Sequence, residues 1–131
     1  MKKHLLGVLG LFVVLAFAVS LQAQRGEWVL LGTGHVNGHE DHDTIRVGIA
    51  DGKFRKIQLR VTGGSVEFDH VIVHFGNGSQ EELPVHEKIH SGGRTRVIDL
   101  PGDQRIIQSV DMWYSQHKWN RMPKVSVFGI R

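Results

Sequence analysis

Apolar and polar residues alternate most regularly in segment 54–75. The first half of this segment has an apolar residue at every second position, at Ile57, Leu59 and Val61. A period of two is typical of a half-buried β-strand, because successive side chains point to opposite faces. The glycine pair 63–64 can supply the positive φ angles of a tight turn. The pattern therefore predicts a hairpin that places Val61 opposite Val66 and Leu59 opposite Phe68.

The alternation changes phase in the second half of the segment. Val66 and Phe68 share one parity, whereas Val71, Val73 and Phe75 share the other. A regular strand would expose one of these two apolar sets to water. One extra residue in the strand, or a change of sheet, removes the conflict. We therefore expect a β-bulge or a change of sheet near Asp69 and His70.

The turn after Phe75 can be chosen by parity. A three-residue loop of Gly76, Asn77 and Gly78 places Val71 opposite Leu83, whereas a two-residue loop leaves Leu83 facing a residue of the other parity. We expect the three-residue loop, with Gly78 in the left-handed conformation. Pro84 lacks a backbone donor, which indicates that the following strand lies at a sheet edge.

Further short strands are predicted at 28–31, 44–49, 94–100, 104–114 and 124–130, separated by frequent turn signals. Apart from the amino-terminal segment, the chain lacks a helical period. The pattern predicts an all-β fold, a single small β-sandwich of about eight or nine short, mostly antiparallel strands. A small β-barrel is the alternative.

The first 23 residues have the composition of a cleavable signal peptide. Lys2 and Lys3 precede an apolar run from Leu5 to Val19, and a small residue, Ala23, ends the segment. Cleavage after Ala23 is preferred, with cleavage after Ser20 as the alternative. An uncleaved anchor is disfavoured, because the apolar run is shorter than the roughly 20 residues of a typical spanning helix. We therefore expect a periplasmic or secreted protein with a signal peptide at 1–23 and one domain at 24–131.

Composition limits the partners of the mature domain. Removing 23 of 131 residues leaves 108, and removing Lys2 and Lys3 from 16 basic residues leaves 14 against 13 acidic ones. A nearly neutral domain without a basic run argues against nucleic acid, which requires a concentrated cationic surface. The chain has no cysteine, so its fold rests on the core without disulfides. The mature segment also lacks a second hydrophobic run, so no membrane span is expected in it.

Four motifs are spread along the mature chain: WVLLG at 28–32, DHDTIRV at 41–47, VHFGNG at 73–78, and RVIDLPG at 96–102 followed by Arg105 to Ile107. Together they resemble a family of uncharacterised small exported bacterial proteins. The resemblance spans most of the mature chain. It implies a periplasmic or secreted β-domain without an assigned activity, and so provides no catalytic residues.

Segment 35–43 (HVNGHEDHD) holds the candidate metal ligands His35, His39, His42 and Asp43. Imidazole and carboxylate groups suit zinc, copper or nickel. A solvated polar loop, with Asp43 hydrogen-bonded to the backbone where the next strand begins, is the simpler interpretation. His70 and His74 lie four residues apart on one predicted strand, which favours two surface residues on one face. A resident cofactor is therefore not expected, although a divalent metal is possible.

Trp113, Tyr114 and Trp119 form the aromatic set near the carboxyl end. Adjacent strand residues point in opposite directions, so Trp113 or Tyr114 must lie in the core. Trp119, in a predicted polar loop, is the candidate ligand-stacking residue of a carbohydrate-binding module. Asp99 is expected to pair with an arginine near the turn at 100–103.

The sequence contains no recognisable nucleophile, base and acid set, and no glycine-rich loop that opens a helix. We therefore expect a non-enzymatic β-sandwich with a binding or structural role at the cell envelope, where its partner is an envelope component or a glycan. A metal-dependent protein that uses segment 35–43 is the rival of another class.

Overall fold

The computed structural model describes residues 26–36, 42–115 and 122–131. Their strands are β1 (Val29–His35), β2 (His42–Arg46), β3 (Lys53–Phe54), β4 (Lys56–Thr62), β5 (Val66–Phe75), β6 (Gln80–Leu83), β7 (Lys88–Ile89), β8 (Ile98–Asp99), β9 (Arg105–Ser115) and β10 (Lys124–Ile130). One turn of 3₁₀ helix, η1 (Ile49–Asp51), precedes β3.

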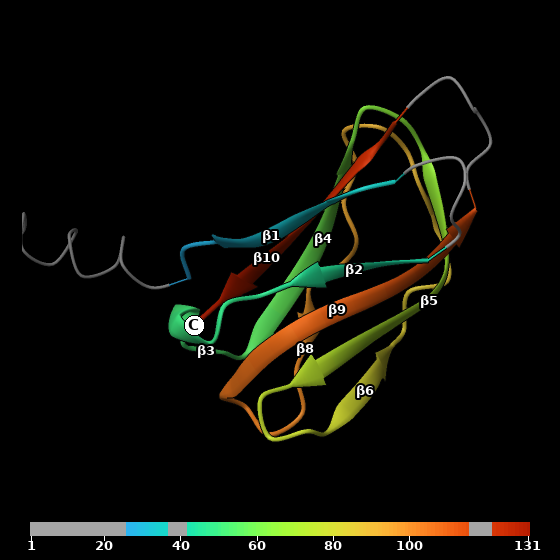
Figure 1. The fold of residues 1–131 in the computed structure, drawn as a ribbon. Helices are drawn as coiled ribbons and strands as arrows, with labels where there is room; N and C mark the ends of the chain where they lie inside the picture. Colours follow the sequence, from blue (N-terminus) through green and yellow to red (C-terminus); the bar gives the residue numbers. More distant parts are fainter. Residues whose placement is uncertain (1–25, 37–41, 116–121) are drawn as a thin grey trace, which may run out of the picture.

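The strands form two antiparallel sheets that pack face to face (Figure 1). The first sheet has the order β1-β10-β4-β8, and the second has the order β2-β9-β5-β6, with β3 also paired to β9 and β7 to β5. The predicted all-β sandwich is confirmed, and no ladder among the described strands closes the sheets into a barrel. Within the described residues, no helix has the length and apolar character needed to cross a membrane.

The core lies between the two sheets and is built from alternate residues of the long strands. The first sheet contributes Ile57, Leu59, Val61, Val125 and Val127, and the second contributes Val66, Phe68, Val71, Val73, Phe75, Val110, Met112 and Tyr114. The intervening residues of β5 and β9 therefore face away from the core. This outer face of the second sheet carries the groups described below.

The predicted phase break in β5 is confirmed as a bulge. The register between β5 and β9 changes from Phe68 opposite Tyr114 to His70 opposite Trp113, and this shift leaves Asp69 without a partner in the ladder. Phe68 is 1% exposed and Val71 is fully buried. The extra residue lets both apolar sets of β5 reach the same core.

The predicted hairpin at Gly63 and Gly64 is wrong. β4 and β5 belong to different sheets, and β4 pairs instead with β10 over the whole length from Lys56 to Thr62. The two glycines, at φ 79° and 156°, carry the chain across from one sheet to the other. Alternation determines which side of each strand is buried, and that side faces the same core in either arrangement.

The three-residue turn after Phe75 is confirmed, because Val71 pairs with Leu83 and Gly78 has a φ of 89°. β6 lies at the edge of the second sheet, as Pro84 indicated. The strand predicted at 94–100 is largely wrong, since only Ile98–Asp99 forms one. Before it, Thr95 is joined to β4 by backbone and side chain together: its amide donates to the Leu59 carbonyl at 2.9 Å, and its hydroxyl accepts a hydrogen bond from the Leu59 amide at 3.1 Å.

Candidate functional site

A row of aromatic rings crosses the outer face of the second sheet. Trp113 on β9 has His42 of β2 as its register partner on one side and His70 of β5 on the other. The His42 ring stacks on the indole with a centroid distance of 4.3 Å and an interplanar angle of 11°. His70 meets the indole edge-to-face at 6.4 Å, and His86 meets His70 in the same way at 6.0 Å.

The β-bulge lies beside this row and connects it to the segment after β6. The Asp69 carbonyl, which the bulge removes from the ladder, accepts a hydrogen bond from His86 Nδ1 at 2.8 Å. A carbonyl can only accept, so Nδ1 of His86 carries the proton. His70 Nδ1 lies 2.8 Å from a Glu82 carboxylate oxygen on β6. The bulge carbonyl thus holds His86, and Glu82 holds His70, at the edge of one hollow.

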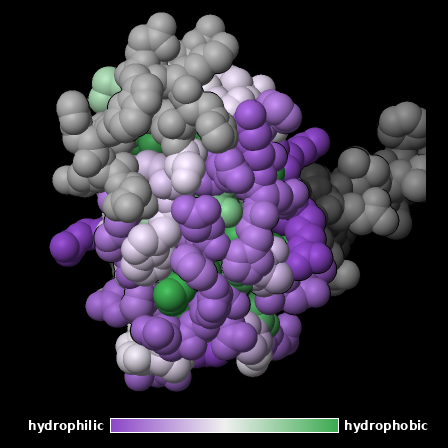
Figure 2. Space-filling model, turned by 90° about the vertical axis from the view of Figure 1, so that its right-hand side faces the viewer, coloured by the Kyte–Doolittle hydropathy of each residue, from purple (hydrophilic) through white to green (hydrophobic). Residues whose placement is uncertain are grey.

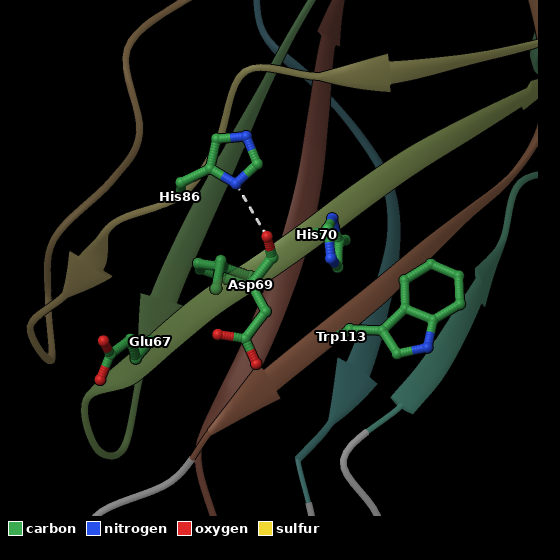
Figure 3. Close-up of a pocket in the computed structure, with 6 residues that line it drawn as sticks. Glu67, Asp69, His70, His86 and Trp113 are labelled. Carbon is green, nitrogen blue, oxygen red and sulfur yellow. Dashed lines mark hydrogen bonds between the residues drawn. The ribbon is translucent and has the colours of Figure 1, made fainter.

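This hollow, hereafter the Trp113 hollow, has a volume of about 560 Å³. It is lined by Glu67, Phe68, Asp69, His70, His86 and Trp113 (Figure 3). Asp69, His70 and His86 are exposed, whereas Trp113 is half-buried. An aromatic ring, carboxylates and imidazoles thus surround one open space.

A second polar cluster adjoins the row around Asp111 on β9. Its carboxylate accepts hydrogen bonds from the Thr44 hydroxyl and from His74 Nε2, the latter at 2.7 Å. His42 Nε2 lies 3.4 Å from the same carboxylate and makes no hydrogen bond within the described residues. Burial opposes ionisation, but the hydrogen bonds from Thr44 and His74 and the charges of both histidines outweigh it and lower the pKa of Asp111. Asp111 therefore anchors side chains from β2 and β5 on the outer face.

The structure describes three of the four candidate metal ligands of segment 35–43, namely His35, His42 and Asp43. His35 ends β1 in the first sheet, and His42 begins β2 in the second, so both lie in strands where a loop was predicted. Asp43 accepts a hydrogen bond from the Thr44 amide at 2.8 Å, as expected for the start of a strand. His39 lies outside the described residues, among which no three metal-ligating side chains are placed to hold one ion.

The structure describes two of the three aromatic candidates, Trp113 and Tyr114. Tyr114 is 3% exposed in the core and Trp113 lies on the outer face, which confirms that one of the pair is buried. Trp119 lies outside the described residues. His70 and His74 share the outer face of β5 as predicted, at positions opposite Trp113 and Ser109.

Sequence reasoning assigned no site role to Glu67, Asp69, His86 or Asp111. Alternation along β9 could have placed Asp111 on the face of Trp113, because the two residues share a parity. The position of His86 depends on the bulge carbonyl that it binds, and the residues around His86 in the sequence do not predict that contact.

The face of the molecule shown in Figure 2 is predominantly hydrophilic. Figure 2 shows scattered hydrophobic residues rather than one broad apolar surface on the face that it presents. Recognition on this side would therefore depend on hydrogen bonds and isolated rings, not on a large apolar contact.

Comparison with solved structures gives matches of low sequence identity. Pseudomonas aeruginosa AlgX is 14% identical, with a TM-score of 0.52, and the match covers 80% of this chain but only 27% of the AlgX chain. A Yersinia pseudotuberculosis-derived mitogen is 8% identical, with a TM-score of 0.46 and coverages of 80% and 86%. A mutant family 29 carbohydrate-binding module is 9% identical, with a TM-score of 0.37 and coverages of 80% and 90%.

No curated protein sequence matches this chain. A family model, in contrast, matches residues 9–129, which is nearly the whole sequence. The expected resemblance to an uncharacterised family is therefore confirmed. The chain belongs to the family described as domain of unknown function DUF2541.

Proposed function

We propose that this protein is an exported, non-catalytic binding domain of the cell envelope, and that it binds a glycan in the Trp113 hollow. One observation carries the proposal: an indole ring, one face of which is covered by His42, lines one open hollow together with carboxylates and imidazoles on the outer face of a sheet. A sugar ring has an apolar face of C–H groups, which packs against an aromatic surface. It also has a rim of hydroxyls, which need hydrogen-bonding partners.

The polar groups of the hollow match hydroxyl ligands. Carboxylates such as that of Asp69 accept hydrogen bonds from hydroxyls, and each imidazole can donate or accept according to its tautomer. The bulge and the His86 bond to the Asp69 carbonyl fix the backbone at the centre of the lining. Groups held in place before binding lose little entropy when a ligand arrives.

Trp113→Ala is expected to weaken polysaccharide binding by tenfold or more, because it removes the aromatic surface of the hollow. The measurement is affinity electrophoresis of the purified protein in gels that contain soluble neutral or acidic polysaccharides. Trp28→Ala is the matched control, since Trp28 is also half-buried but lies beside Arg60 of β4, in the first sheet. Asp69→Asn, an exposed and nearly isosteric change, should also weaken binding while leaving the fold intact.

Two results would contradict glycan binding at this site. One is the absence of retardation by every polysaccharide tested. The other is an equal loss in Trp113→Ala and Trp28→Ala while both variants keep the wild-type circular dichroism spectrum. Release of reducing ends from a bound polysaccharide would contradict the non-catalytic part of the proposal.

Export has its own test. The basic start, the apolar run and Ala23 lead us to expect that the protein in the envelope fraction begins at Gln24, or at Leu21 if cleavage follows Ser20. Intact-mass spectrometry of that fraction distinguishes the two. Recovery of the chain from Met1 in membranes would show that the signal is not cleaved.

A further inference from the structure

A second hollow lies at the other end of β9. Its volume is about 250 Å³, and its lining includes Lys53, Phe75, Asn77, Gln104 and Arg105. Arg105 begins β9, whereas Trp113 is near its end, so the two hollows are separated by roughly 27 Å at the rise of an extended strand. The second hollow is therefore independent of the Trp113 hollow.

Arg105 is held rigidly at this hollow by uncharged groups. Its guanidinium carbon lies 3.7 Å from the centre of the Phe75 ring, and Nη1 donates to the Pro101 carbonyl at 2.8 Å. Nη2 donates to the Ser79 hydroxyl at 2.8 Å and, more weakly, to the Asn77 side-chain oxygen at 3.4 Å. These acceptors orient the guanidinium plane without neutralising its charge.

The cationic charge of the hollow is not cancelled by ion pairs in the described part of the chain. The sequence suggested that Asp99 pairs with an arginine, but its carboxylate instead lies 3.5 Å from Lys56 Nζ. Neither Lys53 nor Arg105 belongs to an ion pair among the described residues. The lining includes two cations and the amides of Asn77 and Gln104, and it contains no carboxylate.

We propose that this hollow binds a phosphate group. A phosphate carries roughly 1.5 to 2 negative charges near neutral pH, which Lys53 and Arg105 together would balance. Arg105 retains donors that these acceptors do not use, and a guanidinium held in one plane suits phosphate oxygens. Lys53 adds a mobile point charge, and the side-chain amides add further donors. The group can come from inorganic phosphate or from a phosphate ester.

The test is a calorimetric titration of the purified protein with inorganic phosphate and, separately, with glycerol 3-phosphate. Lys53→Glu should weaken binding by at least tenfold, because it replaces an attractive charge with a repulsive one. Lys124→Glu makes the same change in net charge at an exposed position of β10, and should alter the affinity by less than about twofold. Both lysines are exposed, so neither variant should disturb the fold.

Arg105→Lys separates geometry from charge. It keeps the cation but loses the planar donors, so it should weaken phosphate binding while Lys124→Glu does not. Binding of inorganic phosphate alone would identify the free ion as the ligand, and binding of glycerol 3-phosphate would extend the site to esters. The proposal is overturned if neither compound binds at millimolar concentration, or if Lys124→Glu lowers the affinity as much as Lys53→Glu.

Discussion

Phe68→Ala is expected to lower the free energy of unfolding by about 3–5 kcal/mol, the cost of deleting a buried phenylalanine ring. Phe68 is 1% exposed, and it lies in the core immediately before the bulge. The cavity cannot close easily, because the bulge fixes the chain on one side and the Phe68 amide is bonded to the Glu87 carbonyl at 3.0 Å. Urea unfolding monitored by circular dichroism gives the difference.

His70→Ala is the control on the other side of the same bulge. Its ring is exposed and contacts Glu82 and Trp113 on the outer face, so its loss should cost less than about 1 kcal/mol. Equal losses in the two variants would show that the outer-face row, and not the core side of β5, dominates the stability of this strand.

The elements predicted best from sequence were those specified by local parity. The apolar residues Val66 and Phe68 have one parity, and Val71 and Val73 have the other. This change of parity required an extra residue between the two sets, and the bulge occurs there. The three-residue turn also fixed the register between β5 and β6, because few residues separate the two strands. Where a short loop joins two paired strands, the length of the loop leaves little freedom in their register.

The local pattern of apolar and polar residues did not predict which strand pairs with β4. β4 pairs with β10, which lies more than 60 residues later in the chain, and not with the adjacent β5. Both arrangements bury Leu59 and Phe68, so burial alone does not distinguish them. The difference depends on which backbone groups find partners across the whole sheet.

The same limit applies to the candidate site. Sequence reasoning placed His70 and His74 on one face of a strand, and this was confirmed. Their proximity to Asp111 and Trp113 follows from the order β2-β9-β5, which brings together strands from three separate segments. His35 and His42, close in sequence, are instead divided between the two sheets.

Close packing between the first sheet and β3 depends on a glycine near the end of β10. A Cβ atom on Gly129 would lie 2.8 Å from Phe54 Cδ1 and 3.0 Å from Leu31 Cδ1. The Phe54 ring is fully buried and has Arg131 above it at 4.9 Å, so it cannot easily move away. The missing side chain thus provides the space that this ring occupies.

Gly129→Ala is therefore expected to destabilise the fold by about 1–3 kcal/mol, the usual cost of adding an atom to a filled core. Gly48→Ala is the matched control, because Gly48 is exposed and its new methyl group would meet the Asp51 carboxylate at 3.3 Å. Both changes restrict the unfolded chain equally, so their difference measures the native-state clash. Phe54→Leu should cost less in the Gly129→Ala background than alone, since it removes the ring atoms that clash. Equal denaturant midpoints for Gly129→Ala and the wild type would show that Phe54 and Leu31 can move aside without cost.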